Sequence, residues 1–327
     1  MTVRAAVIGC GDWGRNHAAV LARFGVLAAV ADADGARAAE LADRLGCASM
    51  DIPALLADPR IDAVVVALPP VHHAGMAQRV LESGKHLLVE KPMALTLADA
   101  RRIQDLAAAR GRVAMTGHIL RFHPAFVALL GLVQSGRLGR LQRAEARRKG
   151  FGKFFPGTDV LWDLAPHDLS LLLALTGRAP QAASGRVARV ISPMADEAEL
   201  ALDFGAGFRA RISLSRVFAG KERQLRLEGA RGTAVFDDLA PWPEKLTFAP
   251  VGGAPMPVPV PETAPLDAQT RHFLDCIASG QEPHASARHG VEVLEMLSGI
   301  EIEDTGAAAL AAGWGSVALP LRRGGAA

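Results

Sequence analysis

The stretch that decides the fold is Val3-Arg4-Ala5-Ala6-Val7-Ile8-Gly9-Cys10-Gly11-Asp12-Trp13-Gly14, an apolar run that leads into a G-x-G-x-x-G motif. With a strand over 2–8 and a helix over 15–24, the motif stands in the strand–turn–helix context of dinucleotide-binding proteins. In order, its three glycines permit a tight turn, let the backbone approach a pyrophosphate, and let the helix pack on the strand. The free N–H groups at the start of the helix would bind the phosphates.

A second strand, over 26–31, ends in Asp32. A carboxylate at this place accepts hydrogen bonds from the adenosine ribose and repels a 2′-phosphate, which favours NAD over NADP. Two alternatives stay open. The following Ala33-Asp34-Gly35 makes a turn or helix-cap role for Asp32 compatible with the sequence, and Arg37 is near enough to leave NADP as the less favoured cofactor.

The alternation of strands and helices continues to about residue 118. The run 61–68 has no polar alternation, as expected of a parallel strand covered on both faces. Shorter apolar strands follow over 85–89 and 113–116, and Thr96 with Asp99 predicts a capped helix between them. We therefore expect a Rossmann dinucleotide-binding domain over 1–118, with the strand ends lining one crevice.

The 85–89 strand ends in Glu90-Lys91-Pro92. A lysine at this point projects into the ligand crevice of an open α/β sheet, where a charge is costly unless it pairs or reacts. A surface lysine is the alternative. His72 and His73 follow another strand end, and a contact of a helix-start histidine with cofactor or backbone is favoured over a metal, because no second ligand cluster accompanies them.

After Gly117 the alternation stops. Helices are predicted over 125–134, 159–175, 266–278 and 287–302, and strands over 141–149, 183–191, 197–204, 208–214, 224–228, 233–236 and 245–248. Gly205-Ala206-Gly207 predicts a hairpin turn between two of these strands. The second half, 119–327, is therefore predicted to be an α+β domain with a mostly antiparallel sheet.

Asp163 and His167 lie four residues apart in the predicted helix over 159–175, so they share one face. A carboxylate that orients a histidine is a recurring acid/base device. A structural histidine paired with a neighbouring carboxylate explains the pattern equally well, and Pro166 is expected to kink or restart the helix beside the pair.

Composition limits the function classes. The 327 residues carry a net charge of +2, which gives no reason to expect nucleic acid or a membrane as a partner. Three separated cysteines form neither a disulfide framework nor a metal cluster, and they fit a reducing cytoplasm. No signal peptide precedes the first strand. Tyrosine is absent, which excludes a tyrosine acid.

The G-x-G-x-x-G motif, Glu90-Lys91-Pro92 and Asp163-x-x-x-His167 together resemble the glucose–fructose oxidoreductase / inositol dehydrogenase (Gfo/Idh/MocA) family over nearly the whole chain. The resemblance implies that the open sheet of the second domain binds a sugar and packs against other subunits, as a homodimer or homotetramer. It places Lys91 beside the nicotinamide, with Asp163 and His167 flanking the reacting hydroxyl.

A narrower likeness, to the nucleotide-sugar branch, rests on the stretches 117–124, 161–168, 221–222 and 234–238. Members of this branch oxidise C3 of UDP-N-acetylglucosamine or of its uronic acid. The chain departs from the branch at Asp163, where serine is frequent, and at Arg216, where tryptophan is expected.

Three sets of site residues are predicted. The cofactor set is Gly9, Gly11, Asp12, Trp13, Gly14, Asp32, Leu68, Pro69, His73, Glu90, Lys91 and Pro92. The catalytic set is Lys91, His167 and Asp163. The substrate set is Lys91, Arg121, Arg147, Lys153, Asp163 and His167, and no metal is expected.

The predicted reaction is NAD-dependent oxidation of a secondary sugar hydroxyl. Either His167 is the base and Lys91 stabilises the developing charge on the oxygen, or Lys91 is itself the base. The charges around Arg147 also suit a solvated strand edge. Two alternative functions remain: a dehydrogenase of a free sugar or inositol, and a dinucleotide-binding regulator without turnover.

Overall fold

The computed structural model describes residues 3–152, 154 and 158–305, and the chain divides into two compact units. The first unit contains the chain up to His123 together with Thr263–Leu294, and the second contains Pro124–Glu262 and the chain from Glu295 onward. The predicted single boundary after residue 118 lies near the first of these crossings. The return of 263–294 to the first unit has no counterpart in the prediction.

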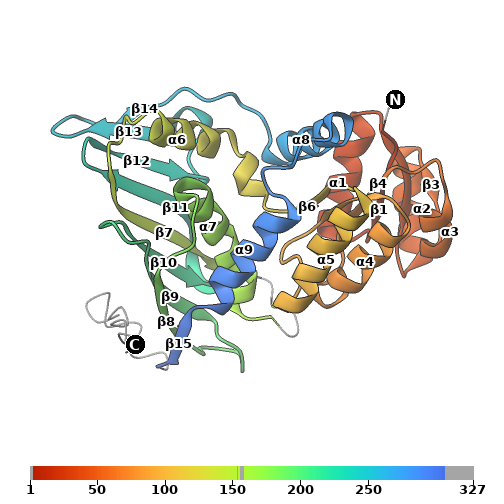
Figure 1. Cartoon of the computed structure of the whole chain (residues 1–327), viewed down its shortest axis with the longest axis horizontal. Helices are drawn as coiled ribbons and strands as arrows, with labels where there is room; N and C mark the ends of the chain where they lie inside the picture. The colour runs from red at the N-terminus through yellow and green to blue at the C-terminus, as the bar shows by residue number, and fades with distance from the viewer. Residues whose placement is uncertain (1–2, 153, 155–157, 306–327) are drawn as a thin grey trace. The chain divides into compact units, whose positions relative to one another are not determined.

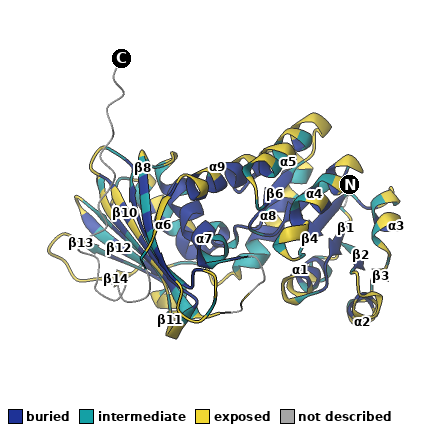
Figure 2. Cartoon of the chain, turned by 90° about the horizontal axis from the view of Figure 1, so that it is seen from below, coloured by how far each residue is buried: buried dark blue, intermediate teal, exposed yellow. Residues whose placement is uncertain are grey.

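The first unit is built on a six-stranded parallel sheet in the order β3-β2-β1-β4-β5-β6 (Figure 1). Its strands are β1 (Ala5–Ile8), β2 (Leu27–Ala31), β3 (Ala48–Ser49), β4 (Ala63–Val66), β5 (His86–Val89) and β6 (Ala114–Thr116). All four residues of β1 and of β4 are buried (Figure 2). The continuous apolar runs in the sequence therefore correspond to strands covered on both faces.

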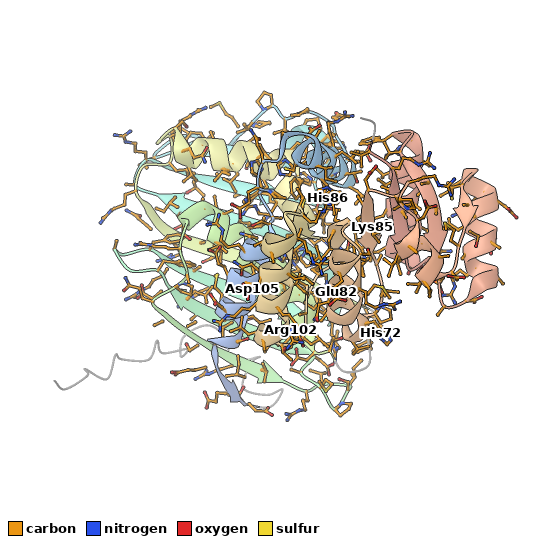
Figure 3. The ribbon with its side chains drawn as sticks, turned by 45° about the vertical axis from the view of Figure 1, so that its right-hand side comes forward. His72, Glu82, Lys85, His86, Arg102 and Asp105 are labelled. Carbon is orange, nitrogen blue, oxygen red and sulfur yellow. The ribbon has the colours of Figure 1, made fainter. Side chains whose placement is uncertain are left out.

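The helices of this unit are α1 (Asp12–Arg23), α2 (Gly35–Leu45), α3 (Ile52–Ala57), α4 (His73–Glu82), α5 (Leu97–Arg110), α8 (Pro265–Ser279) and most of α9 (Ala287–Ser298), with the short turns η1 (Pro70–His72) and η2 (Ile119–Phe122). The capping prediction for α5 is confirmed, because the Asp99 N–H donates to Thr96 Oγ1 at 3.1 Å. Arg102 and Asp105 lie on the exposed side of α5 (Figure 3). Helix α8 packs on α1 and η2, and its Phe273 is fully buried in the core formed with β1 and β4.

The second unit is built on a nine-stranded sheet in the order β14-β13-β12-β11-β7-β10-β9-β8-β15 (Figure 1). Its strands are β7 (Leu141–Phe151), β8 (Ala182–Ala188), β9 (Glu197–Asp203), β10 (Arg209–Ser215), β11 (Val217–Gly229), β12 (Gly232–Asp237), β13 (Leu246–Pro250), β14 (Met256–Pro257) and β15 (Glu301–Asp304). Two pairs, β7 with β10 and β8 with β15, are parallel and the others are antiparallel. The predicted hairpin at 205–207 joins β9 and β10, as expected.

Two helices, α6 (Pro124–Gln134) and α7 (Val160–Thr176), pack on one face of this sheet, and a short turn, η3 (Trp242–Glu244), precedes β13. The strands alternate as antiparallel strands do. Ala146, Ile212 and Leu225 point to the helix-covered face and are buried, whereas Arg147 and Ser213 point to the opposite face. We call this opposite face, which α6 and α7 do not cover, the polar sheet face.

Besides the helix α3 and the part of β11 before Gln224, which were not predicted, three short segments differ from the predictions. The helix predicted over 287–302 ends at Ser298, and residues 301–304 instead form β15 beside β8. The two-residue strands β3 and β14 were not predicted. Each of these segments lies at the edge of a sheet, where pairing with a single neighbouring strand, rather than a local pattern of side chains, defines the strand.

Candidate active site

The glycine-rich turn has the geometry that phosphate binding requires. Gly9 has a φ of +99°, and a Cβ added to Gly14 would lie 1.7 Å from the carbonyl oxygen of Gly9. A Cβ at Gly11 would meet no atom within 4 Å, and no side chain caps the start of α1. Asp12 pairs with Arg15 instead, at 2.6 Å. The N–H groups of the first turn of α1 therefore face a position that suits the diphosphate of NAD.

Asp32 is held at the carboxyl end of β2. Its Oδ2 accepts a hydrogen bond from the Cys10 N–H at 2.6 Å, and its Oδ1 accepts one from the Asp34 N–H at 2.9 Å. The helix-cap role belongs to Asp34, which caps α2. Arg37 lies 3.5 Å from Asp32 and 3.2 Å from Asp34, so two carboxylates already neutralise its charge.

Glu90 is an interior residue that fixes the backbone before Lys91. His17 Nε2 of α1 lies 2.8 Å from Glu90 Oε1, and the Lys91 N–H donates to Oε2 at 3.1 Å. Burial favours a raised pKa for Glu90, but His17 and Lys91 outweigh it and hold that pKa below its usual value. A Cβ at Gly117 would lie 2.9 Å from Glu90 Oε2, so the segment between β6 and η2 needs a glycine here.

His73 braces two strand ends. Its Nδ1 lies 2.7 Å from the carbonyl oxygen of Pro92, and its Nε2 lies 2.7 Å from that of Leu68. The residue is only 1% exposed. The predicted contact of this histidine with backbone is therefore present, and through it His73 holds the segments that follow β4 and β5. Its contact with the cofactor stays a prediction.

Helix α7 carries the predicted Asp–His pair. Asp163 and His167 are both partly exposed and lie one turn apart, and the helix continues through Pro166 without restarting. Asp168 serves a separate structural role. Arg148 of β7 donates to it from Nε and Nη2, each at 2.9 Å, in a buried bidentate pair. This pair fixes α7 on the sheet and with it the orientation of His167.

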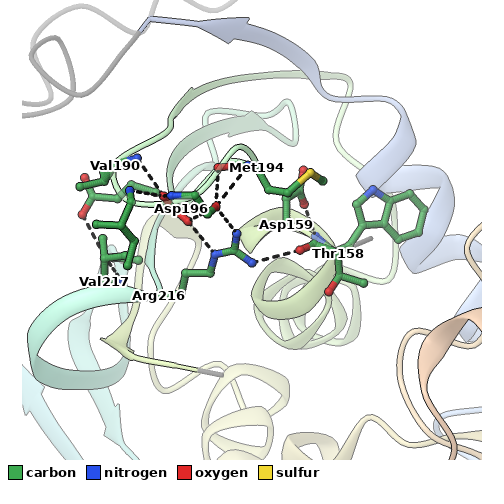
Figure 4. Close-up of polar contacts among 12 residues, drawn as sticks. Thr158, Asp159, Val190, Met194, Asp196, Arg216 and Val217 are labelled. Carbon is green, nitrogen blue, oxygen red and sulfur yellow. Dashed lines mark hydrogen bonds and ion pairs between the residues drawn. The ribbon is translucent and has the colours of Figure 1, made fainter. Parts of the chain in front are cut away.

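A second buried ion pair supports the start of α7 (Figure 4). Arg216 donates from Nε to Asp196 at 3.0 Å, from Nη1 to the Thr158 carbonyl at 3.0 Å, and from Nη2 to Ser192 Oγ at 2.9 Å. Asp196 also accepts from the backbone N–H groups of residues 190–192. Although burial opposes it, these donors hold the pKa of Asp196 below its usual value. Arg216, where a tryptophan was expected, thus joins three segments next to Asp159, the cap of α7.

The remaining predicted substrate residues belong to different units. Arg121 belongs to the first unit and Arg147 to the second. Arg147 lies on the polar sheet face, opposite to α7, where it lines a cavity of about 200 Å³ with Lys221, Gln224 and Asp237. The structure therefore does not bring Arg147 together with His167. Lys153 lies outside the described residues.

The structural roles of four residues were not predicted: His17, Arg148, Asp168 and Asp196. Each is a polar residue whose partner is distant in sequence, at 73 residues for His17 and 20 for the other pairs. Within the described ranges, no group of three or more His, Cys, Asp or Glu residues is arranged to hold a metal ion. In the same part of the chain, no helix is both long and apolar enough to span a bilayer.

Comparison with known proteins gives consistent matches for both units. A model described as an oxidoreductase family with an NAD-binding Rossmann fold matches residues 3–118, and the GFO/IDH/MocA C-terminal domain model matches residues 126–235. UDP-N-acetylglucosamine 3-dehydrogenase of Acidithiobacillus ferrooxidans is 35% identical over 229 residues, which cover 69% of this chain and 71% of that protein.

A solved structure of the same Acidithiobacillus enzyme aligns with a TM-score of 0.82 at 32% identity, covering 91% of this chain and 96% of the other. Inositol 2-dehydrogenase of Rhizobium meliloti is 28% identical over 257 residues, covering 74% of this chain and 77% of that protein.

Proposed function

The chain belongs to the GFO/IDH/MocA family of oxidoreductases, and we propose that this NAD-dependent enzyme oxidises the C3 hydroxyl of a UDP-N-acetylhexosamine or of its uronic acid. The observation that carries the proposal is the similarity to a UDP-N-acetylglucosamine 3-dehydrogenase, which extends over both units in sequence and in structure. The stretches 117–124 and 161–168, which resemble the nucleotide-sugar branch, support it.

The roles of the residues follow from the chemistry of the reaction. Oxidation of a secondary alcohol moves the hydroxyl proton to a base and the hydrogen on carbon, as hydride, to NAD⁺, which leaves a ketone and NADH. Lys91 and His167 are proposed to act on the same hydroxyl, one as the base and the other as a hydrogen-bond donor to the oxygen. Asp163 is proposed to orient His167 from the preceding turn of α7.

Several contacts described above would serve this reaction by fixing the catalytic groups. The hydrogen bonds of Glu90 and His73 restrain the backbone on both sides of Lys91. The Arg148–Asp168 pair does the same for α7. Such restraint favours catalysis because groups that are already held in place lose little conformational entropy as the transition state forms.

A second candidate is a dehydrogenase of inositol or a free sugar, which the similarity to inositol 2-dehydrogenase supports. The same catalytic residues would act on a neutral substrate without a nucleotide. For either substrate, we propose a homodimer or homotetramer that assembles through the polar sheet face, since α6 and α7 leave this face of a nine-stranded sheet uncovered.

The test is NADH formation, followed by its near-ultraviolet absorbance, with UDP-sugars, free sugars and inositols. An aminotransferase that removes the keto sugar draws an unfavourable equilibrium forward. We expect turnover with a UDP-N-acetylhexosamine or its uronic acid, and losses of about 100-fold or more in kcat for Lys91→Met and His167→Asn. His72→Asn is the matched control, because His72 is exposed in η1.

Turnover confined to inositols or free sugars would select the second candidate. Bound NAD with no turnover across the panel would refute both candidates and favour the regulator. If Lys91→Met and His167→Asn both kept normal rates, the catalytic assignment would be wrong.

A further inference from the structure

Arg121 is a desolvated cation without an acidic neighbour. It lies in η2, directly after β6, and is partly buried. Burial lowers the pKa of Arg121 to about 10, and no carboxylate among the described residues offsets this or lies within ion-pair distance. The buried Arg148 and Arg216, in contrast, each contact a buried aspartate at 2.9 to 3.0 Å. A guanidinium out of water without a counter-charge is costly, so Arg121 is poised to bind an anion that the protein does not supply.

The groups around Arg121 are histidines. Its Nη1 lies 3.5 Å from His289 Nε2, and the His289 ring packs edge-on against His118 with centroids 5.5 Å apart. His118 is 3% exposed, and its Nδ1 has no hydrogen-bond partner among the described residues. Burial, with the nearby charges of Arg121 and Lys91, lowers the pKa of His118 to about 3. The His118 ring is therefore neutral at pH 7, with an unused polar atom close to two cations.

The order of the strands separates Arg121 from the phosphate site of the cofactor. The glycine-rich turn follows β1, whereas Arg121 follows β6, three strands away in the order β1-β4-β5-β6. At about 4.8 Å between strands, this corresponds to roughly 14 Å across the sheet. An anion at Arg121 is therefore not the cofactor diphosphate at the start of α1. The end of β5 next to β6 carries Lys91, so this edge of the sheet is the substrate side.

We propose that Arg121 and His118 form a binding site for an anionic group of the substrate, either a sugar carboxylate or a phosphate. The inference rests on the proposed function and deepens it, because the site makes the enzyme selective for charged sugars over neutral ones. Guanidinium binds carboxylate and phosphate through paired N–H donors. His118 Nδ1, which is buried without a hydrogen-bond partner among the described residues, adds one donor in the tautomer that carries the ring proton on Nδ1. His289 contacts both the guanidinium and the His118 ring, so it helps to hold the two groups in place.

The first test measures binding without turnover. Pyrophosphate and glucuronate serve as probes, and the thermal unfolding midpoint of the NAD-loaded protein is recorded with each at increasing concentration. We expect one or both probes to raise the midpoint of the wild type, and Arg121→Met to lose most of that shift. Arg121→Lys, which keeps the charge but not the paired donors, is expected to retain part of it. Arg110→Met, on the exposed end of α5, is the matched control and should keep the full shift.

The second test measures selectivity. We expect Arg121→Met to lower the ratio of kcat/KM for the UDP-sugar over a neutral sugar by about 10- to 100-fold, the range for a hydrogen bond to a charged group. A response to glucuronate alone identifies a carboxylate site, and a response to pyrophosphate alone identifies a phosphate site.

Two results would overturn the inference: equal anion shifts in wild type and Arg121→Met, or an unchanged selectivity ratio. If Arg121→Met does not fold, the same comparison with Arg121→Lys and His118→Phe decides the question, since both must weaken the anion shift. Failure of the proposed function has a different signature, in which anions still bind through Arg121 but no UDP-sugar is oxidised.

Discussion

Removal of the Asp168 carboxylate tests how α7 is held. The change Asp168→Asn keeps the size and shape of the side chain but leaves the guanidinium of Arg148 without its counter-charge. The side chain of Asp168 is 1% exposed and that of Arg148 is 10% exposed, so water cannot replace the lost contact. Breaking one partner of such a buried pair costs about 3–5 kcal/mol in the free energy of unfolding.

The two hydrogen bonds give an independent figure. Each is 2.9 Å long and joins charged groups, and bonds of this kind contribute about 1.5–3 kcal/mol apiece. Their sum, about 3–6 kcal/mol, agrees with the loss expected from the unpaired charge. Replacing both residues, as Arg148→Met with Asp168→Leu, removes the ion pair without leaving a buried charge, and we expect this double variant to lie within about 2 kcal/mol of the wild type.

Urea unfolding of the wild type, Arg148→Met, Asp168→Leu and the variant that carries both changes completes a double-mutant cycle. Circular dichroism follows the helices, and tryptophan fluorescence, to which Trp162 of α7 contributes along with three other tryptophans, gives a second signal. With each single variant costing about 3–5 kcal/mol and the double variant at most about 2 kcal/mol, we expect a coupling energy of about 4 kcal/mol or more between positions 148 and 168. A loss below about 1 kcal/mol for Asp168→Asn, or single-variant losses that simply add, would refute the claim that this pair fixes α7.

Three further predictions concern other parts of the two units. Gly117→Ala should destabilise the protein by about 1–3 kcal/mol and lower kcat, because the added Cβ displaces the Glu90 carboxylate. The control is Gly75→Ala, whose added Cβ meets no atom within 4 Å. Equal changes in the thermal unfolding midpoint for the two variants would contradict this explanation. Burial raises the pKa of the Glu199 carboxyl to about 7 from an ordinary value of 4.5, so as pH rises the unfolded chain loses this proton at lower pH than the folded protein does. The free energy of unfolding should therefore fall between about pH 5 and pH 7. Urea titrations at several pH values should show a weaker pH dependence of stability for Glu199→Gln, and an unchanged dependence would contradict this role of Glu199. Asp196→Asn should cost about 3–5 kcal/mol by thermal or urea unfolding, since it leaves Arg216 buried without its charge partner, and a loss near zero would contradict the assigned role.

Local sequence signals predicted most of the first unit. The glycine motif, the capped helix α5 and the apolar run of β4 are each determined by residues close together in the chain. Their physical causes, which are backbone freedom, capping and burial on both faces, act over a few residues. The Asp163–His167 spacing was predicted for the same reason, since the period of a helix fixes which residues share a face.

Contacts between residues that are far apart in the sequence could not be predicted. Nothing near Phe273 indicates that α8 returns to the first unit, because the elements that it packs on, α1 and η2, and the core strands lie far earlier in the chain. Arg147 and Arg148 are adjacent and chemically identical. The register of β7 alone places Arg147 on the polar sheet face and Arg148 beside Asp168. Asp196 and Arg216 likewise become partners only once the sheet of the second unit has formed.

The central claim is that this chain removes hydride from C3 of a UDP-N-acetylhexosamine or of its uronic acid. The most direct measurement uses UDP-N-acetylglucosamine and its uronic acid, each carrying deuterium at C3, with mass analysis of the NADH formed. The account predicts reduced cofactor one mass unit heavier than normal from at least one of them, and none from the Lys91→Met or His167→Asn variants. Unlabelled NADH from both substrates, or no NADH from either while inositol is oxidised, would contradict it.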